Sequence, residues 1–264
     1  MAIIYGMPTL VELPDLESCA RLAHELGLGF VEVNMSFPQY QLDMPDMGRL
    51  AELKEKYGVF FTIHADENTD PCSINPRIAE VYTDTLLRTA ELAAKEDIPV
   101  INMHLLRGVY VTLPERRTYV YAENEERYMA DMCTFRDRVQ AAVGDSGVKL
   151  CVENTDGFDL RFLSRGVDTL LESAAFALTI DIGHDNAIDN RDLPFILARR
   201  DRLTHMHMHD SAGQRVHLAL GDGNADIGWY CALAESTGCR VVLETKTVAA
   251  LKQSVEYLRR NGYK

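Results

Sequence analysis

The sequence predicts one α/β domain, a (β/α)8 TIM barrel that spans residues 1–264. Eight short apolar runs alternate along the chain with helical or mixed segments, and this alternation builds a parallel sheet with helices outside it. No linker or break in composition divides the chain, and its length is common for one such barrel. An open doubly wound sheet is the alternative, but the glycine-rich G-x-G-x-x-G turn expected after its first strand is missing.

The predicted strands are short runs rich in apolar residues. They cover residues 2–6, 30–34, 59–65, 98–105, 148–153, 177–181, 203–209 and 240–245. The predicted helices cover residues 15–26, 44–57, 77–96, 123–143, 167–173, 193–199, 226–237 and 248–260, and Gly27 and Gly58 end the first two. Residues 66–75 form a polar, turn-rich loop. Residues 107–122 hold three tyrosines and several arginines without a clear period, which predicts a long loop or lid.

The composition is typical of a globular protein with a large core, at 47% apolar and 25% charged residues. The net charge of −13 opposes attraction to nucleic acid, so nucleic acid is not an expected partner. Six cysteines form no C-x-x-C pair, which argues against a structural zinc site. We expect a reduced, cytoplasmic protein without a membrane partner, because the sequence shows no signal peptide and no apolar run of roughly 20 residues.

Histidines concentrate between residues 202 and 223, in the stretch RLTHMHMHDSAGQRVHLALGDG. His205, His207, His209 and His217 are four of the eight histidines in the chain. The first three occupy every second position, which places them on one face of a strand. Imidazole is the commonest metal ligand in proteins. The stretch therefore indicates a metal or acid–base site, with a histidine-rich surface strand as the alternative.

Acidic residues and histidines recur at or near the C-terminal ends of the predicted strands. They are Glu32, His64, His104, Glu153, Asp181, His207 and Glu244. In a TIM barrel these strand ends converge on one mouth, where active sites are found. Each residue alone could be an ordinary core histidine or half of a rim ion pair. Together they favour a shared site, because buried charges are costly unless they are paired or bound to a metal.

Part of this set suits one divalent cation, with the ligands Glu153, Asp181, His207 and Glu244. Three carboxylates and one imidazole fit Zn²⁺ or Mn²⁺, with Mg²⁺ or Co²⁺ as further choices. His64 and His104 could hold a second ion, with Glu153 as the bridging ligand. His184 and His217 are expected to form a further metal site or to donate hydrogen bonds to substrate oxygens.

Over nearly its whole length the chain resembles the xylose isomerase-like TIM-barrel superfamily, which includes sugar and sugar-phosphate isomerases and epimerases and the related type IV apurinic endonucleases. The matching motifs are TIHA, INMH, VENT, DIGH, HMHD, HLALGDG and VLET, which contain His64, His104, Glu153, Asp181, His184, His207, His217 and Glu244. The resemblance places the shared metal quartet on the four ligands given above. The endonuclease branch uses three zinc ions and an aspartate where this chain has Arg215, and an arginine cannot ligate a metal. A third metal site is therefore not expected.

The resemblance implies a divalent-metal-dependent sugar or sugar-phosphate isomerase or epimerase that acts on a small polyhydroxy carbonyl compound. The metal would stabilise an enediolate, while Glu153 and Glu244 take and return the proton. The predicted substrate-binding residues are Glu32, His184, His217, Arg107 and Arg215. The two arginines would bind a phosphate or carboxylate, or else are solvated loop charges.

Other activities are compatible with the same residues. An endonuclease IV-like phosphodiester hydrolase would use two metals on abasic DNA, and the arginines and tyrosines of residues 107–122 suit that substrate. An inosose dehydratase-like lyase would use the same metal and the same acid–base pair, and a metal-binding barrel without catalysis is a further alternative. Residues 107–122 could cap their own pocket or that of a neighbouring subunit in a homo-oligomer.

Overall fold

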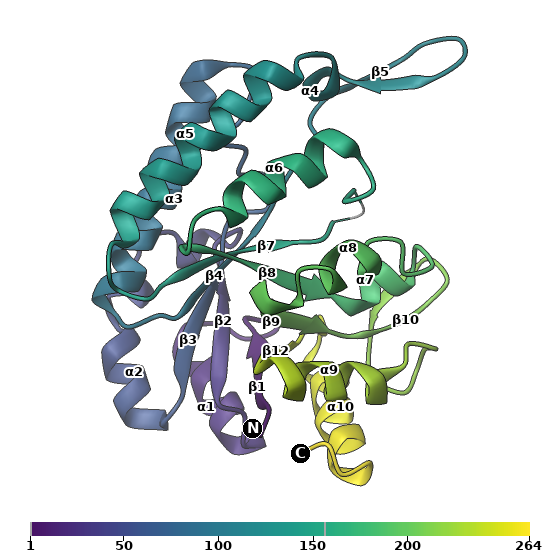
Figure 1. The fold of residues 1–264 in the computed structure, drawn as a ribbon. Coiled ribbons are helices and arrows are strands. Elements are labelled where there is room, and N and C mark those ends of the chain that lie inside the picture. The colour runs from purple at the N-terminus through teal and green to yellow at the C-terminus, as the bar shows by residue number, and fades with distance from the viewer. Residues whose placement is uncertain (1, 156) are drawn as a thin grey trace.

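Eight parallel strands close into a barrel in the computed structural model, which describes residues 2–155 and 157–264 (Figure 1). In barrel order they are β1 (Ile4–Pro8), β12 (Arg240–Leu243), β9 (Leu203–Met208), β8 (Phe176–Asp181), β7 (Lys149–Glu153), β4 (Val100–His104), β3 (Phe60–His64) and β2 (Phe30–Asn34). The barrel closes at β1, where Gly6 pairs with Val242 on one side and Phe30 on the other. The predicted (β/α)8 TIM barrel is confirmed.

Helices cover the outside of the barrel. They are α1 (Leu16–Leu26), α2 (Leu50–Tyr57), α3 (Pro76–Lys95), α5 (Glu125–Val143), α6 (Arg161–Leu171), α8 (Leu193–Leu197), α9 (Ile227–Thr237) and α10 (Val248–Arg260), with the short α4 (Val120–Glu123) and α7 (Ile182–Asn186) in loops. Local signals fix their ends: the Asp15 carboxylate accepts from Ser18 N at 2.7 Å to begin α1, and Gly27, with a φ of 67°, ends it. Among the described residues, no helix is both long and apolar enough to span a membrane.

Two predicted helices have other bounds in the structure. Residues 44–57 divide into a 3₁₀ turn, Pro45–Gly48, and α2, because the Asp46 carboxylate accepts from Leu16 N at 3.1 Å and ties the turn to the start of α1. The helix predicted at residues 167–173 begins at Arg161, six residues earlier. Its first five residues include Arg161 and Arg165, whose charges conceal in the sequence the apolar face formed by the buried Phe162, Leu163 and Val167.

Two β-hairpins form in regions that were predicted to be loops. Residues 107–122, expected to form a loop or lid, contain β5 (Tyr110–Thr112) and β6 (Arg117–Tyr119), which pair antiparallel and project from the barrel (Figure 1). The Arg117 guanidinium lies over the Tyr110 ring at 4.1 Å from its centroid. The second hairpin, β10 (Asp210–Ala212) with β11 (Arg215–Leu218), follows β9 at the mouth of the barrel.

A substitution at Gly6 tests the packing where the barrel closes, because Gly6 contacts the buried Phe30 ring. A Cβ atom on residue 6 would lie 2.5 Å from that ring. We therefore expect Gly6→Ala to lower the free energy of unfolding by about 1–3 kcal/mol in urea titrations, as overpacked cores do. Gly48→Ala is the matched control, since a Cβ there meets nothing within 4 Å. Equal stability of the two variants would contradict this account of the closure.

Candidate active site

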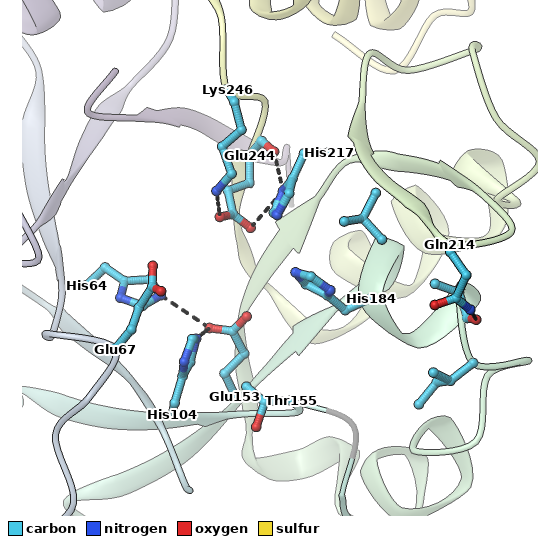
Figure 2. Close-up of a pocket in the computed structure, with 13 residues that line it drawn as sticks. His64, Glu67, His104, Glu153, Thr155, His184, Gln214, His217, Glu244 and Lys246 are labelled. Carbon is cyan, nitrogen blue, oxygen red and sulfur yellow. Dashed lines mark hydrogen bonds and ion pairs between the residues drawn. The ribbon is translucent and has the colours of Figure 1, made fainter. Parts of the chain in front are cut away.

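A cavity of about 590 Å³ opens at the C-terminal ends of the barrel strands (Figure 2). Its described lining includes the predicted site residues His64, His104, Glu153, His184, His217 and Glu244. These side chains come from β3, β4, β7, α7, β11 and the segment after β12, which are far apart in the sequence. The structure thus brings together side chains that the sequence placed at separate strand ends.

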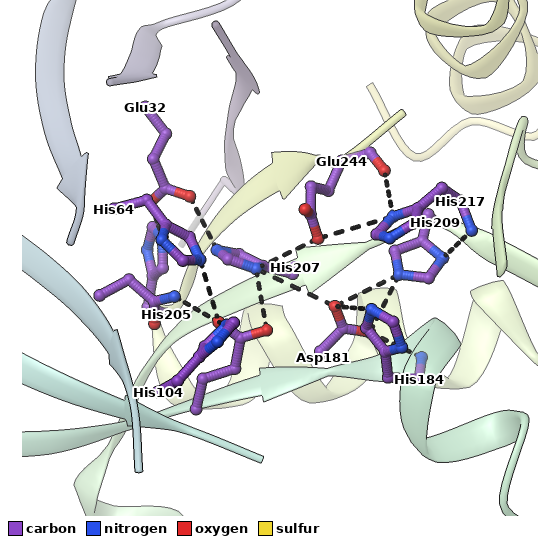
Figure 3. Close-up of polar contacts among 12 residues, drawn as sticks. Glu32, His64, His104, Asp181, His184, His205, His207, His209, His217 and Glu244 are labelled. Carbon is purple, nitrogen blue, oxygen red and sulfur yellow. Dashed lines mark hydrogen bonds and ion pairs between the residues drawn. The ribbon is translucent and has the colours of Figure 1, made fainter. Parts of the chain in front are cut away.

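His207 on β9 lies at the centre of the site and is fully buried. Its Nδ1 atom lies 3.3 Å from Glu153 Oε1, 3.3 Å from Glu244 Oε2 and 4.0 Å from Asp181 Oδ2 (Figure 3). Donor atoms of these four residues all lie within 4.8 Å of one another, which is compatible with one metal ion. The arrangement contains the four ligands expected from the sequence.

The strand register explains why these residues meet. In neighbouring parallel strands, Asp181 pairs with His207, and His207 pairs with Val242. Glu244 follows β12 and donates its main-chain N–H to Met208 O at 3.0 Å, which holds the segment beside the end of β9. The register therefore places the ligand-bearing ends of β8, β9 and β12 at one height in the barrel.

Glu32 lies in the barrel interior beside His207, with 1% of its surface exposed. Its Oε1 lies 2.8 Å from His207 Nε2 and its Oε2 lies 2.8 Å from His205 Nε2. Burial opposes ionisation of Glu32, but His207 and His205 outweigh it and hold the pKa of the carboxyl well below its usual range. Glu32 thus orients His207, and its role in substrate binding stays a prediction.

His64, His104 and Glu153 form a second group of potential ligands. Glu153 Oε2 lies 3.5 Å from His64 Nε2 and 3.3 Å from His104 Nε2, and it also accepts a hydrogen bond from the buried Asn102 amide. Burial lowers the pKa of His64, but the Glu153 carboxylate more than offsets it and raises that pKa to about 9. Donor atoms of these three residues lie within 4.8 Å of one another, so they could hold a second ion.

The centre of the site carries a surplus of negative charge. Burial raises the pKa of Glu153 and of Glu244, but His207 more than offsets it and holds both well below their usual range. The same carboxylates raise the pKa of His207 well above its usual value, against the effect of burial. A site that favours a proton for this reason also favours a metal cation, because a cation neutralises the same charge.

His184 and His217 stand on the other side of the cavity. Their ring centroids are 4.9 Å apart, and His217 Nδ1 lies 3.2 Å from Glu244 O. Burial lowers the pKa of His217 to about 4, which leaves its ring neutral near pH 7. The Asp181 carboxylate accepts from His184 N at 2.7 Å and so begins α7. Both rings are in position to face a bound substrate.

The structure places the two predicted arginines away from the described lining of this cavity. Arg215 is exposed on β11, and the Arg107 side chain is partly buried and packs beside Gly157. Their roles in substrate binding stay predictions. Lys246, by contrast, lines the cavity, and its Nζ lies 2.7 Å from Glu244 Oε1. Sequence reasoning missed it, although its spacing of two residues from Glu244 is a usable signal.

Asp210 shapes the loop that carries His217. Its buried carboxylate accepts main-chain hydrogen bonds from Ser211, Gly221 and Ala225 at 2.9–3.0 Å. Gly223 passes so close that a Cβ there would lie 2.2 Å from Ser211 O. The loop after β9 is therefore built around one carboxylate rather than around an apolar core.

Asp185 on α7 is a buried carboxylate that no cation neutralises among the described contacts. Its Oδ1 accepts from Asp192 N at 2.9 Å, while its Oδ2 has no hydrogen-bond partner among the described residues. Burial, with a further contribution from the Asp192 and Asp181 charges, raises its pKa from 3.8 to about 7. This residue makes the stability of the mouth sensitive to pH.

Comparisons with known proteins agree with this geometry. A family model described as xylose isomerase-like TIM barrel matches residues 20–261. Comparison with curated proteins gives no match. Among solved structures, a D-tagatose 3-epimerase-like protein is 21% identical, with a TM-score of 0.78 and coverage of 98% of this chain and 96% of that one.

Two further structures are similar at lower identity. The 3-keto-D-glucoside 4-epimerase YcjR from E. coli is 14% identical, with a TM-score of 0.76 and coverage of 98% and 99% of the two chains. D-psicose 3-epimerase from Clostridium cellulolyticum H10, solved with D-tagatose, is 15% identical, with a TM-score of 0.74 and coverage of 99% of each chain. These likenesses show a shared fold.

We expect the free energy of unfolding to fall as the pH rises from about 4 to about 7, because the folded protein holds the Asp185 proton more tightly than the unfolded chain does. At about 1.4 kcal/mol per pKa unit, the loss is on the order of 2–4 kcal/mol. Asp185→Asn should therefore be more stable than wild type at pH 8 and similar at pH 4, in urea titrations of chelator-treated protein. Asp201→Asn, at an exposed position, is the control. A stability difference independent of pH would contradict the assignment.

Proposed function

The chain belongs to the xylose isomerase-like TIM-barrel family, and on that premise we propose that it is a divalent-metal-dependent sugar isomerase or epimerase. Its substrate is a small polyhydroxy carbonyl compound, and its catalytic groups are Glu153 and Glu244. The similar solved structures support the choice of substrate class, because their titles name epimerases of sugars.

One observation carries the proposal: both ring nitrogens of His207 are buried without a hydrogen-bond partner among the described residues, and Nδ1 faces three carboxylate groups. Without a metal these carboxylates raise the pKa of His207, so a proton stands between Nδ1 and the carboxylates. The buried carboxylates are unfavourable without positive charge among them. A divalent cation bound through Nδ1 would replace that proton and neutralise more of the charge, and one imidazole with three carboxylates suits Mn²⁺ or Zn²⁺.

A divalent cation held there would act as a Lewis acid that polarises the substrate carbonyl and acidifies the proton on the adjacent carbon. Glu153 and Glu244 would move that proton, one as base and the other as acid. They come from β7 and the segment after β12, which β8 and β9 separate in the barrel, so they approach the cavity from different directions. Lys246 helps to keep Glu244 ionised.

The remaining lining would bind the hydroxyl groups of the sugar. His184 and His217 offer ring nitrogens, and Gln214 offers an amide. Among the described lining residues, the acids Glu67, Glu153 and Glu244 outnumber the single lysine. We therefore expect an unphosphorylated sugar, because the one lysine among the described lining residues is paired with Glu244 and no arginine is among them to bind a phosphate.

The group formed by His64, His104 and Glu153 favours a second candidate, a two-metal phosphodiester hydrolase. Two ions would activate water and stabilise the leaving oxygen. The acidic lining of the cavity opposes a polyanionic substrate. The two candidates therefore differ in how many ions the protein must hold and in the charge of the molecule it must admit.

Metal stoichiometry separates the two candidates. We expect about one ion per chain by elemental analysis of purified protein, and the same value for His64→Ala, because the quartet does not include His64. His24→Ala is the control, since His24 lies on α1 and its ring contacts Tyr57 O. Two ions in wild type with one lost in His64→Ala would favour the hydrolase, and no bound ion would refute both candidates.

Glu244→Gln should lower the turnover of a ketohexose by about 10²–10⁴-fold, the usual contribution of a positioned acid–base group. The change removes a charge but alters little volume, so circular dichroism and melting temperature should stay close to wild type. Glu235→Gln, at an exposed position on α9, should retain full activity. Normal turnover by Glu244→Gln would exclude this carboxylate from proton transfer.

A further inference from the structure

His209 is the third histidine of the alternating run, and neither the metal quartet nor the proton-transfer step uses it. It follows β9 and is fully buried beside Asp181 (Figure 3). We propose that His209 is a positioning residue that holds the Asp181 carboxylate through its Nε2–H group, and that the main-chain N–H of His217 selects the tautomer that can do so. The inference rests on the proposed function, in which Asp181 is a metal ligand.

The Asp181 carboxylate is held from two directions. His209 Nε2 lies 3.1 Å from Oδ1 and 3.2 Å from Oδ2, and His184 N donates to Oδ1 at 2.7 Å. An ionised carboxylate only accepts hydrogen bonds, so the His209 nitrogen that faces it must carry a proton. His209 Nε2 therefore bonds the same oxygen, Oδ2, that faces His207 Nδ1 at 4.0 Å, while His184 N holds Oδ1.

The other ring nitrogen of His209 reports which tautomer is present. His217 N lies 2.8 Å from His209 Nδ1, and a main-chain N–H can only donate. His209 Nδ1 must therefore be unprotonated, which places the ring proton on Nε2. The Asp210 carbonyl oxygen lies 3.3 Å from Nδ1 and makes no hydrogen bond with it in this tautomer, because both atoms are then acceptors.

Two neighbours of His209 have backbones that accommodate this arrangement. His217 adopts a φ of +55°, a left-handed conformation that side-chain-bearing residues rarely adopt, and this conformation directs its N–H at the ring. At Gly183, a Cβ atom would lie 2.0 Å from the His209 ring, so only glycine leaves room for it. The position of the ring is thus specified by the residues on both sides.

The same contacts argue that His209 is not itself a metal ligand. His184, His209 and His217 have donor atoms within 4.8 Å of one another, a spacing that a metal ion could use. However, the Nδ1 lone pair of His209 accepts from His217 N, and its Nε2 faces Asp181. Ligation would require His209 to give up one of these two contacts.

Two substitutions separate the role of the Nε2 proton from that of ring volume. His209→Gln places an amide N–H near the position of Nε2 and keeps the donor to Asp181, whereas His209→Asn is too short and keeps only an acceptor near Nδ1. Partners of metal ligands typically contribute about 10–100-fold to affinity. We expect His209→Asn to bind Mn²⁺ that much more weakly in chelator competition, His209→Gln to stay within a few-fold of wild type, and the ion count to be unchanged.

The outcomes are distinct. Equal weakening in both variants would reduce His209 to a packing role, and loss of one ion per chain in either variant would make it a ligand. If wild type bound no Mn²⁺ or Zn²⁺, the proposed function would fail, and with it any role of His209 towards a metal. A His24→Gln variant, altered on α1 away from the mouth, controls for nonspecific loss of binding.

The tautomer is tested without any metal. Long-range ¹H–¹⁵N spectra of the chelator-treated chain distinguish the two neutral tautomers from the charged ring, and the His209 signals are those missing from the His209→Gln spectrum. We expect a neutral ring with its proton on Nε2 and an unprotonated Nδ1. A bare Nε2 would overturn the proposed hydrogen bond to Asp181, and a proton on Nδ1 would overturn the selection of the tautomer by His217 N.

Discussion

Charge neutralisation around His207 is the constraint on which the mouth of this barrel depends. The carboxylates of Glu32, Glu153, Asp181 and Glu244 all lie within 4.0 Å of its ring nitrogens, and none of them is more than 9% exposed. Bringing so many like charges out of water is unfavourable unless cations or hydrogen bonds compensate them. The nearby histidines therefore help to neutralise these carboxylates, in addition to the catalytic or binding roles proposed for them.

The parallel barrel makes such a concentration of charge possible. Each strand contributes one or two side chains at its C-terminal end, and the closed register brings those ends to one mouth. Asp181 pairs directly with His207, and Glu153 with His104, so residues far apart in sequence become neighbours across a strand pair. Below the mouth the strands are buried and most of their side chains are apolar, which gives the charged layer a rigid base.

Around this base, the loops determine what the site can bind. Asp210 anchors the loop that presents His217, and Lys246 provides a cation beside Glu244. These polar contacts fix the cavity without the apolar packing that holds the barrel, and loops of this kind are where TIM barrels vary in specificity. In the proposed function these loops would contact the hydroxyl groups of a sugar.

The sequence by itself determined the barrel and predicted the residues of the quartet, because strand periodicity, glycine-terminated helices and polar strand ends are local signals. It did not reveal the hairpin formed by β5 and β6, the early start of α6, or the position of Lys246. Only the tertiary structure assigned different roles to Glu32 and His209, which the sequence could only class as polar groups near a mouth. The reason is physical: a hydrogen-bond partner depends on distances between strands, and those distances exist only once the barrel has closed.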